Sequence, residues 1–85
     1  MREKLAGALS LPRELMLNLP QITLTGASEA LIENYKNIIE YSETFIRVHT
    51  NSGVLALTGS RLVLKQLTAE NIIVCGKISK LEFLE

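Results

Sequence analysis

The chain has 85 residues, of which 47% are hydrophobic and only 5% aromatic, so it fits one small domain with an aliphatic core. Its formal net charge is zero, so the chain lacks the strong positive field that attracts nucleic acids or anionic membranes. The single Cys75 excludes an internal disulfide and is typical of a reducing cytoplasm. Because a neutral surface resists self-association only weakly, the sequence does not decide between a monomer and a homo-oligomer.

Residues 1–20 are predicted to be a lead-in to a domain that spans residues 21–85. Leu5 and Leu9 are spaced for one or two helical turns, whereas Pro12 and Pro20 favour extended geometry, so the lead-in is either a short helix or extended. Its apolar stretch is interrupted by polar residues and is too short to span a bilayer. We therefore expect no signal peptide and no direct membrane insertion.

Alternating apolar and polar residues predict β-strands from Gln21 onward. A first strand over residues 21–25 ends at Gly26. A second covers residues 30–35, and Lys36-Asn37 is predicted to turn the chain into a short return strand over residues 38–41. A helix that starts near Ser28 is the weaker alternative for this region.

The second half of the chain shows the same alternation. Residues 45–50 are predicted to bury one face and to leave the other wet, before a hairpin turn at Asn51-Ser52-Gly53. Residues 54–58 and 61–66 are predicted to pair around a turn at Gly59-Ser60, with Leu55, Leu57, Leu62 and Leu64 pointing inward.

A continuous apolar run over residues 72–75 is predicted to be the most buried strand and to end at Gly76. In the last strand, either a bulge lies near Ser79 or both faces are partly buried. The sequence thus predicts an all-β fold, a compact antiparallel β-roll or sandwich of seven or eight short strands.

Catalytic chemistry has weak support in the sequence. Cys75 and His49 are the only thiol and imidazole, but Cys75 lies in an apolar run, where a thiol behaves as an inert hydrophobe, and His49 lies at the polar end of a strand. The acidic residues Glu29, Glu33, Glu40 and Glu43 are interpreted as solvated surface charges rather than as an acid/base pair. No metal-ligand spacing and no phosphate-binding loop is present. We expect no catalytic residue, no metal and no cofactor.

The order of several short motifs resembles the YabP/YqfC family of sporulation proteins, and within it the YqfC branch. The resemblance begins at Leu11-Pro12 and extends to the end of the chain. It rests on these segments: Leu19-Pro20-Gln21-Ile22-Thr23-Leu24-Thr25-Gly26, the run from Ile32 to Tyr41, Ile46-Arg47-Val48, the run from Gly53 to Gly59, Leu62-Val63-Leu64, and the run from Ile72 to Phe83, which includes Gly76-Lys77-Ile78.

This resemblance implies a role in spore development in the mother cell of an endospore-forming bacterium. It implies no catalytic residue. It also implies a protein partner, a larger YqfD-like membrane protein, to which this chain is a cytoplasmic accessory that reaches the membrane through that partner.

Two functions remain open on the sequence. The first is a non-enzymatic protein–protein interaction or scaffold module that uses a strand edge or an apolar patch, with Phe45, Val54 and Phe83 as candidate contact residues. The alternative for each of these residues is that its side chain belongs to the hydrophobic core. The second function is a small-molecule or lipid-binding β-domain, which requires a pocket with convergent polar groups.

Overall fold

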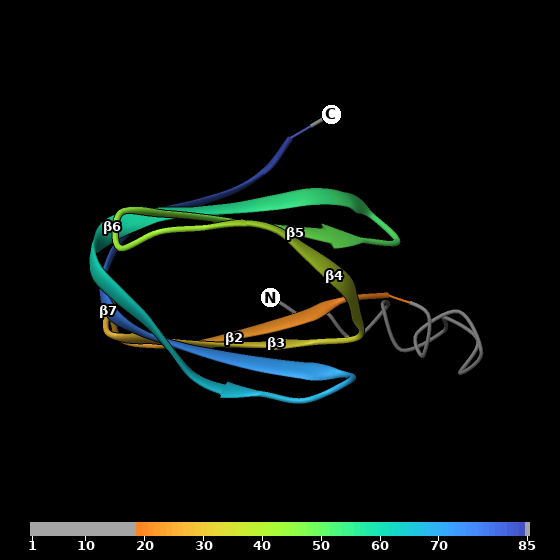
Figure 1. The fold of residues 1–85 in the computed structure, drawn as a ribbon, viewed down its shortest axis with the longest axis horizontal. Helices are drawn as coiled ribbons and strands as arrows, with labels where there is room; N and C mark the ends of the chain where they lie inside the picture. Colours follow the sequence, from red (N-terminus) through yellow and green to blue (C-terminus); the bar gives the residue numbers. More distant parts are fainter. Residues whose placement is uncertain (1–18, 85) are drawn as a thin grey trace, which may run out of the picture.

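Six β-strands make up residues 19–84, the part of the chain that this computed structural model describes (Figure 1). They pair antiparallel throughout in the order β2-β3-β7-β6-β5-β4. No helix occurs within that range, so the helical alternative near Ser28 is wrong. The predicted lead-in lies almost entirely outside the described residues. The strands are β2 (Gln21–Thr25), β3 (Glu29–Glu33), β4 (Tyr35–Tyr41), β5 (Phe45–Thr50), β6 (Gly53–Leu67) and β7 (Asn71–Leu84).

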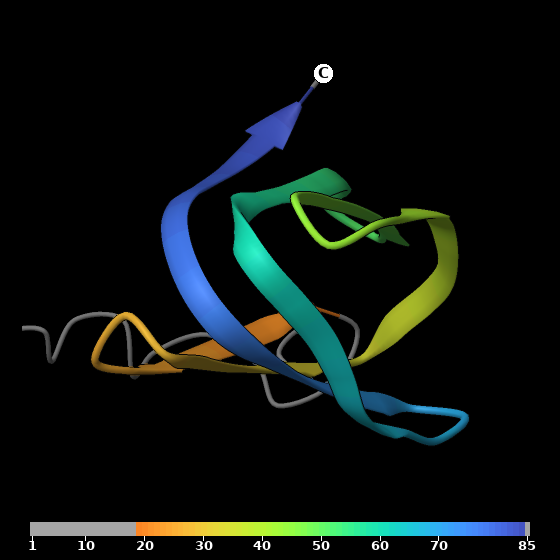
Figure 2. The same ribbon diagram turned by 60° about the vertical axis from the view of Figure 1, so that its left-hand side comes forward.

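The sheet rolls into two layers because β6 and β7 are long and curve from one layer into the other (Figure 2). In one layer, the first half of β7 pairs with β3 and with the second half of β6. In the other layer, the first half of β6 pairs with β5 and with the second half of β7. Strand β2 continues the first layer and β4 continues the second. The prediction of an all-β antiparallel fold is confirmed.

The predicted hairpin turn at Gly59-Ser60 is wrong, because β6 continues through both residues. The chain bends here at an irregularity of the β6–β7 pairing. The ladder shifts between Ser60 and Val63, and Arg61 takes a left-handed φ of 54°. Gly59 lies against the carbonyl oxygen of Lys77, in a space too small for any side chain. Gly59 therefore allows β6 and β7 to approach closely. Besides forming turns, glycine commonly has this role in sheets. Likewise, β7 does not end at Gly76. For both reasons the described residues contain six strands rather than seven or eight.

The predicted turn at Lys36-Asn37 is also wrong, since both residues lie inside β4. The direction of the chain changes at Asn34, which has a φ of 65°. Its backbone N–H donates to Glu70 O (2.9 Å) and its side-chain Nδ2 donates to Leu19 O (3.0 Å). After this residue β4 does not return along β3 but crosses to the opposite border of the sheet (Figure 1).

Asn34→Ala is expected to lower the free energy of unfolding by about 1–2 kcal/mol, because alanine disfavours a left-handed φ and cannot donate to Leu19 O. Urea unfolding would measure the loss. Asn34→Gly is the matched control: it removes the same side-chain hydrogen bond but tolerates the positive φ, so it should cost less. Equal losses for the two variants would show that the φ constraint contributes nothing.

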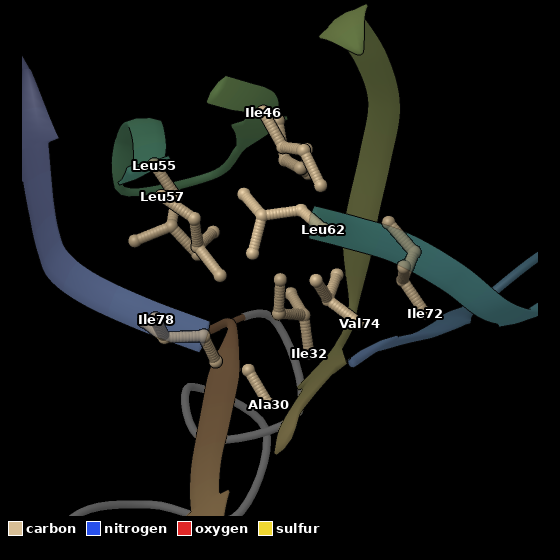
Figure 3. Packing of buried hydrophobic residues seen from close by; sticks show 10 residues of the cluster. Ala30, Ile32, Ile46, Leu55, Leu57, Leu62, Ile72, Val74 and Ile78 are labelled. Carbon is tan, nitrogen blue, oxygen red and sulfur yellow. The ribbon is translucent and has the colours of Figure 1, made fainter. Parts of the chain in front are cut away.

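The core lies between the two layers and is aliphatic, as expected from the composition (Figure 3). On β5, Ile46 and Val48 are buried as predicted. The opposite face is wet only in part, because His49 is exposed whereas Phe45 and Arg47 are half-buried. Leu55, Leu57 and Leu62 are fully buried as predicted, and Leu64 is half-buried against them. The run over residues 72–75 is less buried than predicted, because only Ile72 and Val74 face the core.

Two local predictions in the second half hold. The turn between β5 and β6 lies at Asn51-Ser52, with Thr50 opposite Gly53. Thr50 is buried, and its hydroxyl donates to Gly53 O (2.7 Å) and accepts from the Ser52 N–H (3.0 Å). The bulge at Ser79 is confirmed, since the pairing jumps from Lys80 to Ile78. The Ser79 hydroxyl donates across to Thr58 O (3.0 Å).

Candidate interaction surface

Four stretches of strand have an open edge within the described residues. Two of them are the border strands β2 and β4. The third is the second half of β7, which pairs with β6 but has no strand on its other side after Ile78 bonds to Ala27 O. The fourth is the end of β6, which leaves the second layer after the Leu62 N–H donates to Glu43 O. Open edges expose unpaired backbone donors and acceptors that another strand can use.

The exposed apolar side chains gather on these same edges. Each large apolar side chain that is exposed within residues 21–84 belongs to one of the four open stretches. Its exposed fraction ranges from 43% for Phe83 to 56% for Leu67. The open edges therefore combine free backbone groups with apolar contact area, which is the combination that strand addition uses. The residues are Leu24 on β2, Ile39 and Tyr41 on β4, Val63 and Leu67 on β6, and Phe83 on β7.

The three residues predicted as contacts do not form one patch. Phe45 and Val54 are half-buried on the outer face of the β5–β6 pair, opposite Thr58 and His49 respectively, at the two ends of that pair. Phe83 lies opposite Leu55, whose side chain is in the core, so Phe83 belongs to the other face of the sheet. Of the three, Phe83 alone is exposed and on an open edge.

Sequence reasoning missed the exposed residues of β4. Residues 38–41 were expected to form a short return strand, and neither Ile39 nor Tyr41 was predicted as a contact residue. The residue that could have revealed the true path is Asn34, because asparagine is among the few residues that tolerate a positive φ and thus marks a change of chain direction.

The structure separates the groups considered for catalysis. Cys75 is half-buried on the outer face of β7, and its Sγ lies 3.8 Å from Glu29 Oε1. His49 is exposed on β5 in the other layer, opposite Asn37 and Val54, whereas Cys75 lies opposite Glu29 and Val63. The four candidate acids are also dispersed: Glu29 and Glu33 are on β3, Glu40 is bonded to Arg47 on β5, and Glu43 is in a turn.

Within residues 19–84, no group of three or more histidine, cysteine or carboxylate side chains is placed to hold a metal ion. No pocket is found in the same range. The small-molecule or lipid-binding function therefore has no observation in its favour. The features that remain for function are the open edges of the sheet.

Comparison with known proteins gives one family. A family model described as the YabP family matches residues 18–85. The chain is similar to the uncharacterized protein YqfC of Bacillus subtilis (strain 168), with 31% identity over 85 residues, which is 100% of this chain and 91% of that protein. No solved structure matches the chain.

Proposed function

The chain belongs to the YabP family, as the resemblance in its sequence predicted, and from this premise we propose that it is a non-enzymatic protein–protein interaction or scaffold module that acts in sporulation. Family membership suggests the sporulation-related setting. The molecular role rests on a separate observation, the open strand edges.

The single observation that carries the role is the coincidence of open edges and exposed apolar side chains. Proteins that have no use for an open edge protect it with charged residues, bulges, proline or very short strands. Strand β4 carries two charged residues and two bulges, yet it is seven residues long and still exposes Ile39 and Tyr41. Phe83 is exposed in a similar way on the open part of β7. Such edges support a module that adds its strands to a partner.

We propose further that one partner is a YqfD-like membrane protein and that the chain acts beside the membrane, in the cytoplasm of the mother cell. This partner comes from the family resemblance. Within the described residues, no helix has the length and hydropathy needed to cross a bilayer.

Capture in sporulating cells tests the proposal. The full chain, carrying an affinity tag, is expected to retain a YqfD-like membrane protein through detergent extraction and washing. Phe83→Asp should reduce capture while the variant stays folded by circular dichroism, because its side chain is 43% exposed. Lys77→Asp is the matched control, since it introduces the same acid at an exposed β7 position that is not apolar.

A wild-type chain that captures neither this protein nor any other specific partner, and that does not associate with itself, would contradict the proposed function. Equal loss of capture in both variants would assign the effect to charge rather than to the apolar edge.

A further inference from the structure

The four open edges differ in charge, and this difference singles out β4. Strand β2 carries no charged residue, and the open part of β6 carries only Lys65. The open part of β7 contains Lys80 and Glu82, whose side chains already pair with each other at 3.3 Å. In β4, by contrast, Lys36 and Glu40 lie near opposite ends of the strand, and Lys36 is exposed without an ion-pair partner in residues 19–84.

The sequence of β4, Tyr-Lys-Asn-Ile-Ile-Glu-Tyr, complements itself when it is reversed. An antiparallel pair of two copies centred on Ile38 brings Lys36 of each copy opposite Glu40 of the other. The same register brings Tyr35 opposite Tyr41, Ile38 opposite Ile38 and Asn37 opposite Ile39. A two-fold axis requires this reciprocity, because residue i must contact residue j while j contacts i.

The faces of the strand agree with this register. On the β5 side, Tyr35, Ile38 and Tyr41 lie opposite Thr50, Val48 and Ile46, and all three of these β5 residues are buried. Since directly opposed residues share a face, Tyr35, Ile38 and Tyr41 belong to the core face of β4. The register centred on Ile38 therefore pairs core-face positions only with core-face positions, and it would extend the apolar face from one copy into the next.

Two bulges in β4 free the side chains that the register uses. The pairing with β5 shifts between Tyr35 and Asn37 and again between Ile38 and Glu40, so Lys36 and Ile39 have no opposed residue on β5. Bulges also increase local twist, which a pair of border strands accommodates more easily than strands inside a sheet. Glu40 accepts a bond from Arg47 Nε on Oε1 (2.9 Å), which leaves its second carboxylate oxygen for a lysine.

We propose that β4 pairs antiparallel with β4 of a second copy of this chain, centred on Ile38 and held in register by two reciprocal Lys36–Glu40 ion pairs. The inference deepens the proposed interaction module by naming one of its partners. Apolar contact between Tyr41 and Tyr35 and between the two Ile38 side chains supplies affinity, while the charges select the register; Tyr41 is 49% exposed in the single chain.

Sedimentation equilibrium on the full chain tests this proposal. The wild type is expected to dimerise with a dissociation constant of about 100 μM or below. Lys36→Glu leaves the Glu40–Arg47 pair intact but sets like charges opposite each other twice, so the dissociation constant should rise about tenfold or more. Lys65→Glu is the matched control, with the same charge change at an exposed position on another open edge, and should leave the dimer unchanged.

Mixing two variants provides the decisive measurement. The second variant combines Glu40→Lys with Arg47→Glu, which reverses the ion pair between β4 and β5 without losing it. Each variant alone should associate with itself about tenfold or more weakly than the wild type does. The mixture should form a heterodimer with an affinity close to that of the wild type, because both contacts again have opposite charges.

A wild type that stays monomeric, a dimer indifferent to Lys36→Glu, or a mixture that does not associate would each overturn the inference. Capture of a different protein by a monomeric chain would preserve the interaction module while rejecting self-pairing, so the two failures can be told apart.

Discussion

Gly59→Ala is expected to lower the free energy of unfolding by about 3 kcal/mol or more, or to prevent folding. A Cβ at this position would overlap the carbonyl oxygen of Lys77 and lie 3.2 Å from the Cα of Ile78. Both atoms belong to the backbone of β7, so relief of the overlap requires separating two paired strands where they bend. A chain of this length has a total stability of roughly 4–13 kcal/mol, and urea unfolding would resolve the loss.

Gly26→Ala is the control for this prediction. A Cβ at Gly26 meets nothing within 4 Å, but the residue has a left-handed φ of 56°. The substitution should cost about 1–2 kcal/mol through backbone conformation alone. If Gly59→Ala cost no more than Gly26→Ala, the close approach of β6 and β7 at the bend would be disproved.

The same glycine explains the main difference between the predicted and the observed fold. Glycine followed by serine between two apolar runs is typical of a hairpin turn, and nothing local distinguishes a turn from a point of close strand contact. The distinction depends on Lys77, which is 18 positions further along the chain. In contrast, β5 and the turn after it were predictable, because alternation and turn residues are local signals.

The candidate surface was less predictable than the fold. Whether a strand lies inside the sheet or at its border depends on strand order, which follows from the path of the chain at Asn34 rather than from the composition of β4. Phe83 was predicted as a contact residue and lies on an open edge, but Ile39 and Tyr41 were not predicted. The self-complementary charges of β4 become meaningful only after the structure places that strand at the border.

Leu62→Ala is expected to lower the free energy of unfolding by about 2–5 kcal/mol, the usual range for a buried leucine that leaves a cavity. Leu62 is fully buried, and its side chain lies between residues of both layers, among them Ile46 and Val74 (Figure 3). Because β6 and β7 pair with each other in both layers and the core is closely packed, the surroundings have little freedom to collapse into the cavity. The loss should fall toward the upper part of the range.

Val63→Ala is the matched comparison, since it shortens the next side chain on the same strand. Val63 is 53% exposed and lies opposite Cys75 on the outer face, so its loss should stay within about 0.5 kcal/mol. The contrast tests whether the alternation of faces continues past the bend at Arg61, where the left-handed φ and the register shift could have reversed it. Similar losses for both variants would mean that the second half of β6 is not held against the core in solution. One of the four open edges would then be a frayed strand end rather than a surface for pairing.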